Sequence, residues 1–170
     1  MIGLGKMLTI EILFEKMEAI DLEEVITIEQ ASFSSPWTKE MFYSEFFDNP
    51  LSFSYVARSD DQVIGYLFFW EVVGELHLMN IAVAGLYRRK GIAQRLIEKM
   101  IEIGRGRAIS KIFLEVRAAN VQALSLYQKL HFYQIGIRKN YYHSPKEDAI
   151  VLQYNFGPNE ICHFERSEKS

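Results

Sequence analysis

The stretch of residues 78–96, with the sequence LMNIAVAGLYRRKGIAQRL, constrains the fold more than any other part of the chain. It begins as a short apolar run and passes through a polar turn with three consecutive cations, Arg88, Arg89 and Lys90. From Gly91 it continues with the apolar spacing of a helix. This order predicts a strand, a loop and the start of a helix.

The start of that helix is predicted to bind an anion. The first amides of a helix lack intrahelical partners and carry the positive end of the helix dipole, so a loop that wraps onto them can hold a pyrophosphate. Gly91 and Ala93 carry little or no side chain, which lets a ligand approach the backbone. The spacing is neither a P-loop nor a dinucleotide fingerprint. The alternative is a charged surface loop before an ordinary helix.

The composition bounds the class of protein. A chain of 170 residues with 49% hydrophobic residues favours a single domain, which we place at residues 7–156, followed by a polar tail at 157–170 that we expect to be disordered. A net charge of −3 gives no bulk electrostatic reason for binding nucleic acid. The single cysteine, Cys162, excludes an intramolecular disulfide and a Cys-based zinc cluster, and the histidines lack metal-ligand spacing. The sequence therefore predicts no metal site.

The longest nearly unbroken apolar run, 63–70, is far shorter than the roughly 20 residues that a membrane helix needs. No signal-peptide pattern opens the chain. We therefore expect a cytoplasmic protein with no membrane partner.

The hydrophobic periods predict an α/β fold with a mixed sheet. The expected strands are 8–14, 51–58, 63–73, a strand ending at 83, 111–117, 131–137 and 149–156, and the expected helices are 21–33, 38–46, 91–104 and 120–130. Asp21 and Glu24 have the spacing of a helix cap, and Thr38 is expected to cap the second helix. Residues 138–148 are expected to be a connection between the last two strands.

Glu115 lies in the middle of the strand at 111–117, where a carboxylate is out of place unless it is paired or functional. One interpretation is an ion pair with Arg117, two positions along on the same face of the strand. The other is a general base in a cleft. The residues alone leave both open.

Two further candidates lie on or before the helix that follows. Tyr127 is by default a core residue with a satisfied hydroxyl, although a phenol near a thioester sulfur could protonate a departing thiolate. Asn120 is by default a helix cap, and secondarily a ligand to the pantetheine arm of a cofactor.

Several segments, in their order along the chain, resemble one family. They are NIAV at 80–83, Arg88-x-x-Gly91-x-Ala93, LEVRAAN at 114–120, Ala123-Leu124-x-x-Tyr127-x-x-Leu130-x-Phe132, RKNYY at 138–142 and EDA at 147–149, with FSSPW at 33–37. The second resembles the acetyl-CoA motif of the GNAT N-acetyltransferases. The whole set, over about residues 8–156, resembles the RimI-like branch, which acetylates the alanine terminus of a ribosomal protein.

The resemblance implies a GNAT fold, with a mixed, mostly antiparallel sheet flanked by helices. It implies direct transfer from acetyl-CoA to a protein N-terminus, in which Glu115 is the base and Tyr127 the acid. The expected cofactor residues are Ile81, Ala82, Val83, Arg88, Arg89, Lys90, Gly91, Ile92, Ala93, Gln94 and Asn120. By analogy, the peptide cleft lies between residues 33–37 and the last hairpin, near Tyr141 and Tyr142.

Three residues depart from the family pattern. Gly85 stands where an Asp-Pro pair is usual, Ala93 replaces a commoner second Gly, and His131 replaces the Gly before Phe132. None removes a group that the mechanism uses. The alternatives are a GNAT enzyme of broader N-terminal specificity, one that acts on small amines or lysine side chains, and a non-catalytic acyl-CoA sensor.

Overall fold

The computed structural model describes residues 11–157, which form one seven-stranded sheet in the order β1-β2-β3-β4-β5-β7-β6. The strands are β1 Ile12–Lys16, β2 Ser52–Ser59, β3 Gln62–Val72, β4 Glu75–Val83, β5 Lys111–Arg117, β6 Tyr133–His143 and β7 Lys146–Asn155. All neighbouring strands are antiparallel except β4 and β5, which are parallel. The predicted mixed, mostly antiparallel sheet is confirmed. Residues 7–10 of the expected domain and residues 158–170 of the expected tail lie outside the described residues.

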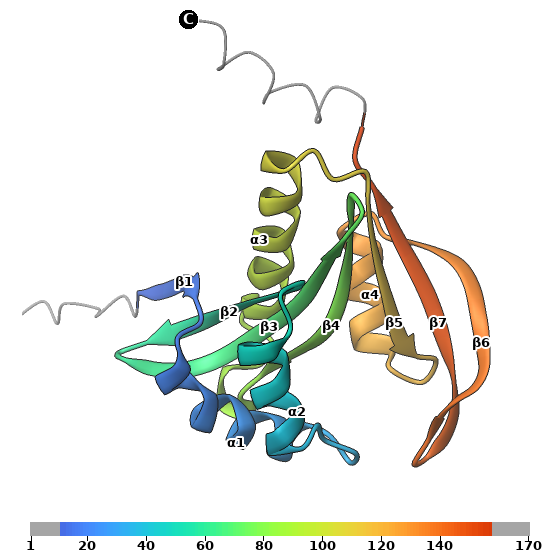
Figure 1. Cartoon of the computed structure of the whole chain (residues 1–170). Coiled ribbons are helices and arrows are strands. Elements are labelled where there is room, and N and C mark those ends of the chain that lie inside the picture. The colour runs from blue at the N-terminus through green and yellow to red at the C-terminus, as the bar shows by residue number, and fades with distance from the viewer. Residues whose placement is uncertain (1–10, 158–170) are drawn as a thin grey trace, which may run out of the picture.

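Helices cover both faces of this sheet (Figure 1). They are α1 Leu22–Ser32, α2 Lys39–Tyr43, α3 Ile92–Gly106 and α4 Val121–Lys129, with short turns of helix at η1 Ala19–Asp21, η2 Ser44–Asp48 and η3 Gly85–Tyr87. In strand β3, Tyr66 and Phe68 pack toward α1 and α2, whereas Leu67 and Phe69 pack in the core that includes α3. Alternate residues of a strand point to opposite faces, so β3 is apolar on both. None of the described helices is long and apolar enough to span a membrane.

The sheet opens between its two parallel strands. The pairing of β4 with β5 covers only Glu75–His77 against Lys111–Phe113. Beyond this point the two strands diverge, so that the ends at Val83 and Arg117 are separated (Figure 1). The β5-facing edge of β4 is therefore available to a bound molecule, because its backbone groups have no strand partner there.

The last hairpin corrects the expected connection at 138–148. Strand β6 runs to His143 and β7 starts at Lys146, so most of that segment is strand. The pairing shifts register between Gln134 and Gly136 and again between Arg138 and Tyr142. Bulges of this kind break the alternation of apolar and polar residues on which the prediction depended. Strand β1 covers Ile12–Lys16, and residues 8–10 of the strand expected at 8–14 lie outside the described residues.

The caps predicted at Thr38 and Asn120 are confirmed, whereas Asp21 occupies the predicted N-cap position of α1 without a capping hydrogen bond from its side chain. Asp21 accepts from the Glu18 amide at 2.9 Å and forms an ion pair with Arg58 at 2.7 Å, instead of capping α1. Thr38 Oγ1 accepts from Met41 N at 3.3 Å. Asn120 Oδ1 accepts from Ala123 N at 3.1 Å and caps α4.

Candidate active site

Two grooves meet where β4 and β5 diverge. The first, which we name the α3 groove, has a volume of about 700 Å³ and lies between the end of β4, the start of α3 and α4. The second, the hairpin groove, has a volume of about 800 Å³ and lies between the loop after α1, β5 and the β6–β7 hairpin. The residues that line both are Ser32, Phe33, Ile81, Asn120, Ala123 and Tyr127. Two grooves with a shared wall suit an enzyme that transfers a group between two bound molecules.

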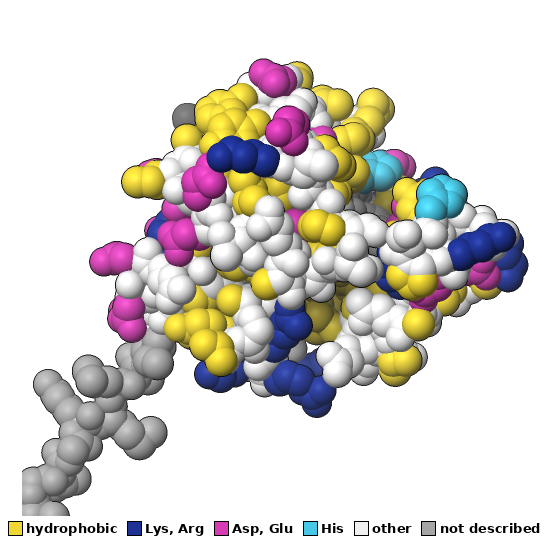
Figure 2. All heavy atoms as spheres, turned by 90° about the horizontal axis from the view of Figure 1, so that it is seen from below, with side chains coloured by type: hydrophobic (Ala, Val, Ile, Leu, Met, Phe, Trp, Pro, Cys, Tyr) yellow, Lys and Arg dark blue, Asp and Glu magenta, His cyan; other side chains and the backbone are white. Residues whose placement is uncertain are grey.

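All the predicted cofactor residues except Lys90 line the α3 groove. Arg89 and Gly91 have φ angles of 62° and 77°, which turn the loop back onto the start of α3. Gly91 suits this left-handed conformation because it has no Cβ. Lys90 lies over the ring of Tyr87, with its Nζ atom 5.4 Å from the ring centroid. The loop lies at the lower end of the sheet, and Lys and Arg side chains gather on the face seen from there (Figures 1 and 2).

Two of the predicted side chains hold the protein itself together. Arg88 donates from Nε to the Val83 carbonyl at 2.9 Å and from Nη2 to Ser32 Oγ at 2.9 Å. It therefore ties the loop to the end of β4 and to the end of α1. Gln94 donates to Glu98 and accepts from Lys129 at 3.0 Å, which connects α3 to α4. These contacts hold the loop and the start of α3 in place.

Tyr127 lies at the junction of the two grooves and is 5% exposed. Its ring packs edge-on against Phe132, with the centroids 5.6 Å apart. Burial raises the pKa of the Tyr127 phenol well above its usual value, and the nearby Tyr142 adds to this rise. The hydroxyl forms no hydrogen bond with any other described residue, unlike a core tyrosine with a satisfied hydroxyl. The phenol therefore stays protonated near neutral pH and keeps its proton available.

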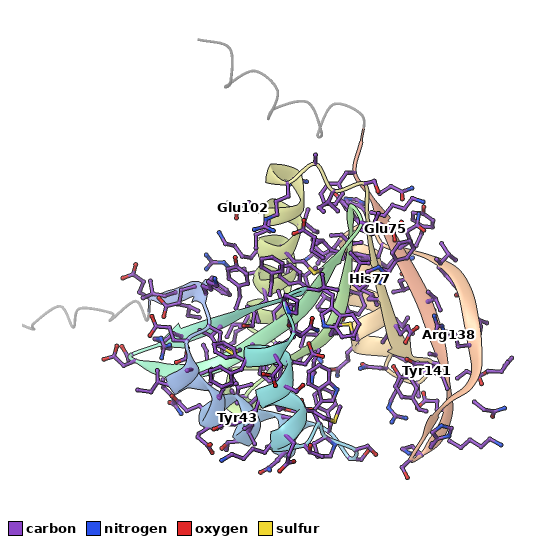
Figure 3. All side chains as sticks on the ribbon, in the orientation of Figure 1. Tyr43, Glu75, His77, Glu102, Arg138 and Tyr141 are labelled. Atoms are coloured by element: carbon purple, nitrogen blue, oxygen red, sulfur yellow. The ribbon has the colours of Figure 1, made fainter. Side chains whose placement is uncertain are left out.

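Glu115 forms an ion pair with Arg138 of β6, with Oε1 2.9 Å from Nε. The expected alternative, an ion pair between Glu115 and Arg117, is wrong. Glu115 pairs with Arg138 of β6, whereas Arg117 pairs with Glu147 of β7. Tyr141 also donates to Glu115, and this hydrogen bond raises the pKa of Tyr141. Arg138 and Tyr141 lie close together on β6 (Figure 3). The Glu115 carboxylate thus lies on the wall of the hairpin groove between two β6 side chains.

Arg117 holds the tip of the β6–β7 hairpin instead. It forms an ion pair with Glu147 at 3.2 Å and donates to the carbonyl groups of Ser144 and Pro145 at 3.1 and 3.2 Å. Its guanidinium also lies 4.1 Å from the centre of the Tyr142 ring. Four contacts from one side chain fix the hairpin tip against the end of β5.

The hairpin groove is bridged at one side. Ser35 Oγ donates to the Ser144 carbonyl at 3.1 Å, and Ser34 Oγ lies 3.5 Å from the same oxygen. The loop after α1 therefore touches the hairpin tip, 109 residues further along the chain. The predicted position of the peptide cleft, between residues 33–37 and the last hairpin, coincides with this groove.

Glu29 is a polar residue of the hairpin groove that was not predicted from the sequence. Glu29 is 2% exposed, and its carboxylate accepts hydrogen bonds from Trp37 N, Tyr66 and Asn80. A signal was present, because Glu29 falls one helical turn after Val25, on the buried face of α1. Among residues 11–157 no three His, Cys, Asp or Glu side chains gather in a group that could hold a metal ion.

Comparison with known proteins agrees with a group-transfer enzyme. The family model described as Acetyltransferase (GNAT) family matches residues 22–132. The chain belongs to this family and is an N-acetyltransferase.

Curated relatives match most of the chain. A Bacillus subtilis protein, provisionally named as a ribosomal protein bS18-alanine N-acetyltransferase, is 36% identical over 136 residues, which cover 80% of this chain and 90% of the relative. The ribosomal protein bS18-alanine N-acetyltransferase of Escherichia coli K12 is 33% identical over 138 residues, which cover 80% of this chain and 92% of the relative.

Solved structures confirm the predicted GNAT fold. The crystal structure of the Escherichia coli ribosomal-protein-S18-alanine N-acetyltransferase superposes with a TM-score of 0.80 at 30% identity, over 88% of this chain and 98% of that one. Arabidopsis thaliana NAA60 in complex with acetyl-CoA shares the fold, with a TM-score of 0.78 at 20% identity, over 86% and 99% of the two chains.

Proposed function

We propose that this protein transfers the acetyl group of acetyl-CoA to the α-amino group of an N-terminal alanine, in a ribosomal protein. Acetyl-CoA would occupy the α3 groove, and the acceptor peptide the hairpin groove. The observation that carries the proposal is Tyr127, which lines both grooves and has no hydrogen-bond partner for its hydroxyl among the described residues. The choice of acceptor rests on relatives named for alanine acetylation of ribosomal protein bS18.

The α3 groove fits the chemistry of coenzyme A. The loop 88–91 and the first amides of α3 offer backbone N–H groups and a positive helix end to the pyrophosphate. The free edge of β4 at Ile81–Val83 offers backbone groups to the pantetheine amides. Asn120 uses its Oδ1 atom to cap α4, which leaves its Nδ2 group to donate to a carbonyl of the same arm. Lys90 does not line the groove, so we leave it out of the proposed site.

Glu115 is the proposed base. The α-ammonium group of a peptide titrates near 8, so a single carboxylate on the groove wall suffices to take its proton, directly or through water, at neutral pH. The freed amine attacks the thioester carbonyl, so that a C–N bond forms as the C–S bond breaks, and the nitrogen loses its second proton to water as the neutral amide forms. In this proposal a backbone N–H group near Val83 stabilises the negative charge on the carbonyl oxygen.

Tyr127 is the proposed acid. The phenol gives its proton to the departing thiolate of coenzyme A, and it lies where the α3 groove and the hairpin groove join. Burial raises the pKa of Tyr127, which keeps the phenol protonated until the thiolate forms. No covalent enzyme intermediate is needed.

The shape of the hairpin groove favours a chain end as acceptor. The contacts of Ser34 and Ser35 with Ser144 bridge the groove at one side. A peptide with an internal lysine would have to pass its chain around this bridge, whereas a chain end would not. Tyr141 and Tyr142 line the same groove and can pack against the first residues of a peptide.

The test uses a set of peptides that share one sequence after the first residue. Peptides that begin with Ala, Ser or Met, and an N-terminally blocked peptide with an internal lysine, are incubated with acetyl-CoA and analysed by mass spectrometry. The proposal expects an acetyl group on the Ala peptide first, and none on the blocked peptide. Acetylation of all free N-termini would show a broader N-terminal enzyme, and acetylation of the lysine alone would overturn the proposal. Binding of acetyl-CoA without any transfer would indicate a sensor.

A further inference from the structure

Glu29 is a buried carboxylate that the proposed mechanism does not use. It lies near the end of α1, lines the hairpin groove and is 2% exposed. Trp37 N donates to Oε1 at 2.7 Å, and Asn80 Nδ2 donates to Oε2 at 3.1 Å. The Tyr66 hydroxyl also donates to Oε2. The three donors come from the loop after α1 and from strands β3 and β4.

All three donors are neutral groups. Burial and the negative charge of Glu29 raise the pKa of Tyr66 far above its usual value, so this phenol donates a proton without losing it. The backbone amide of Trp37 and the side-chain amide of Asn80 carry no net charge. The hydrogen bonds therefore satisfy the oxygen atoms but leave the negative charge uncompensated.

No lysine, arginine or histidine among residues 11–157 forms an ion pair with Glu29. The other two carboxylates of the hairpin groove differ in this respect, since Glu115 pairs with Arg138 and Glu147 with Arg117. Buried charges in proteins are normally paired, because the free energy needed to remove a charge from water exceeds the free energy gained from neutral hydrogen bonds. The cation that would match Glu29 is therefore missing from the described chain, at the wall of a groove open to a ligand.

We propose that Glu29 is a specificity-determining residue whose buried charge is matched by the cationic amine of the acceptor in the hairpin groove. This inference rests on the proposed function, because it takes the hairpin groove as the acceptor site. Glu29 transfers no proton in this role, which distinguishes it from Glu115. It attracts the acceptor in its ammonium form, and the neutral acetylated product loses that attraction. The same charge would thus favour binding of the substrate and release of the product.

The test compares two ligands on two proteins. The ligands are one Ala-starting peptide with a free α-amine and the same peptide with an acetylated terminus, and their affinities are measured by calorimetry with coenzyme A present. Glu29→Gln keeps the size of the side chain and removes the charge. We expect this variant to bind the free-amine peptide about tenfold more weakly, and the acetylated peptide within about twofold of the original protein.

Tyr66→Phe is the matched control, because it removes one donor of the same network and keeps the charge. We expect its ratio of the two affinities to equal that of the unchanged protein. If Glu29→Gln weakens both peptides equally, Glu29 only positions the loop after α1, and the proposal is overturned. If it weakens neither, the proposal is overturned as well.

A second measurement does not depend on the folding of Glu29→Gln. Glu115→Gln removes the proposed base and leaves Glu29 unchanged, so a free-amine peptide should still bind about tenfold more tightly than its α-hydroxy analogue. Equal affinities would contradict the role of Glu29. Failure of the proposed function would look different, because then the original protein would not acetylate the Ala-starting peptide.

Discussion

Arg138 reaches across strand β7 and places its Nε atom 2.9 Å from Oε1 of Glu115. The two residues lie on strands that both pair with β7, where Glu115 is opposite Val151 and Arg138 is opposite Ala149. The ion pair therefore fixes the carboxylate diagonally across the middle strand, on the wall of the hairpin groove. The proposed role of Glu115 as a general base requires a fixed position relative to the proton that it accepts, and this ion pair would supply that constraint.

Glu115→Gln should lower kcat by about 100-fold or more, because the amide has the same size but cannot take the proton of the ammonium group. Affinity for acetyl-CoA should stay the same, since Glu115 lines only the hairpin groove. Steady-state kinetics and calorimetry measure the two quantities. Glu102→Gln is the control, because Glu102 is an exposed carboxylate on α3 (Figure 3). Normal turnover by Glu115→Gln would exclude Glu115 as the base.

Tyr127→Phe should lower kcat by about 100-fold and leave the free energy of unfolding within about 0.5 kcal/mol. The small effect on stability is expected because the hydroxyl has no hydrogen-bond partner among the described residues. Tyr66→Phe gives the contrast. It leaves the buried Glu29 carboxylate without one donor, and should lower the free energy of unfolding by about 1–3 kcal/mol. Denaturant unfolding measures both variants, and a loss of stability in Tyr127→Phe with unchanged kcat would show a purely structural tyrosine.

The parts of the fold that the sequence predicted best are those with local causes. The strand, loop and helix around residues 78–96 follow from a short apolar run, a cluster of cations and a glycine with positive φ, all within one segment. The caps at Thr38 and Asn120 are equally local, because each side chain binds an amide three residues later.

The parts that could not be predicted depend on partners far apart in the chain. Glu29 is bound by Tyr66 and Asn80, which follow it by 37 and 51 residues. The pairing of Glu115 with Arg138 instead of Arg117 depends on the register of β6 against β7, which two bulges shift. The helical spacing places Glu29 on the buried face of α1, but it does not show that Tyr66 and Asn80 bind its carboxylate. The two bulges have no signature within a single strand.

Stability should fall as the pH rises above about 10, because buried tyrosines resist ionisation. Burial raises the pKa of Tyr127, and it raises the pKa of Tyr142 from 10.0 to about 12. At a pH between the unfolded and folded pKa values of such a tyrosine, the unfolded chain has lost a proton that the folded protein keeps. Each further rise in pH therefore lowers the free energy of unfolding. The contribution is fully present below about pH 10. Denaturant unfolding at pH 9, about 10 and about 11 measures the slope.

Tyr127→Phe should make that decline shallower, since one of the buried phenols no longer titrates. Tyr133→Phe is the matched control, because Tyr133 is 44% exposed. It should leave the slope as it is. An equal slope in Tyr127→Phe and the original protein would show that Tyr127 does not resist ionisation in the folded state.

His131→Gly should raise the free energy of unfolding by about 1 kcal/mol. His131 stands after α4 with a φ of 66°, a left-handed conformation that glycine adopts without strain. Its backbone amide donates to the Gln128 carbonyl at 3.0 Å, and glycine keeps this hydrogen bond. The exposed imidazole lies outside both grooves, so turnover should not change. His131→Ala is the control, because alanine removes the imidazole and keeps the strain. If the unfolding temperature of the His131→Gly variant is equal to or lower than that of the His131→Ala variant, the left-handed conformation of His131 costs no stability.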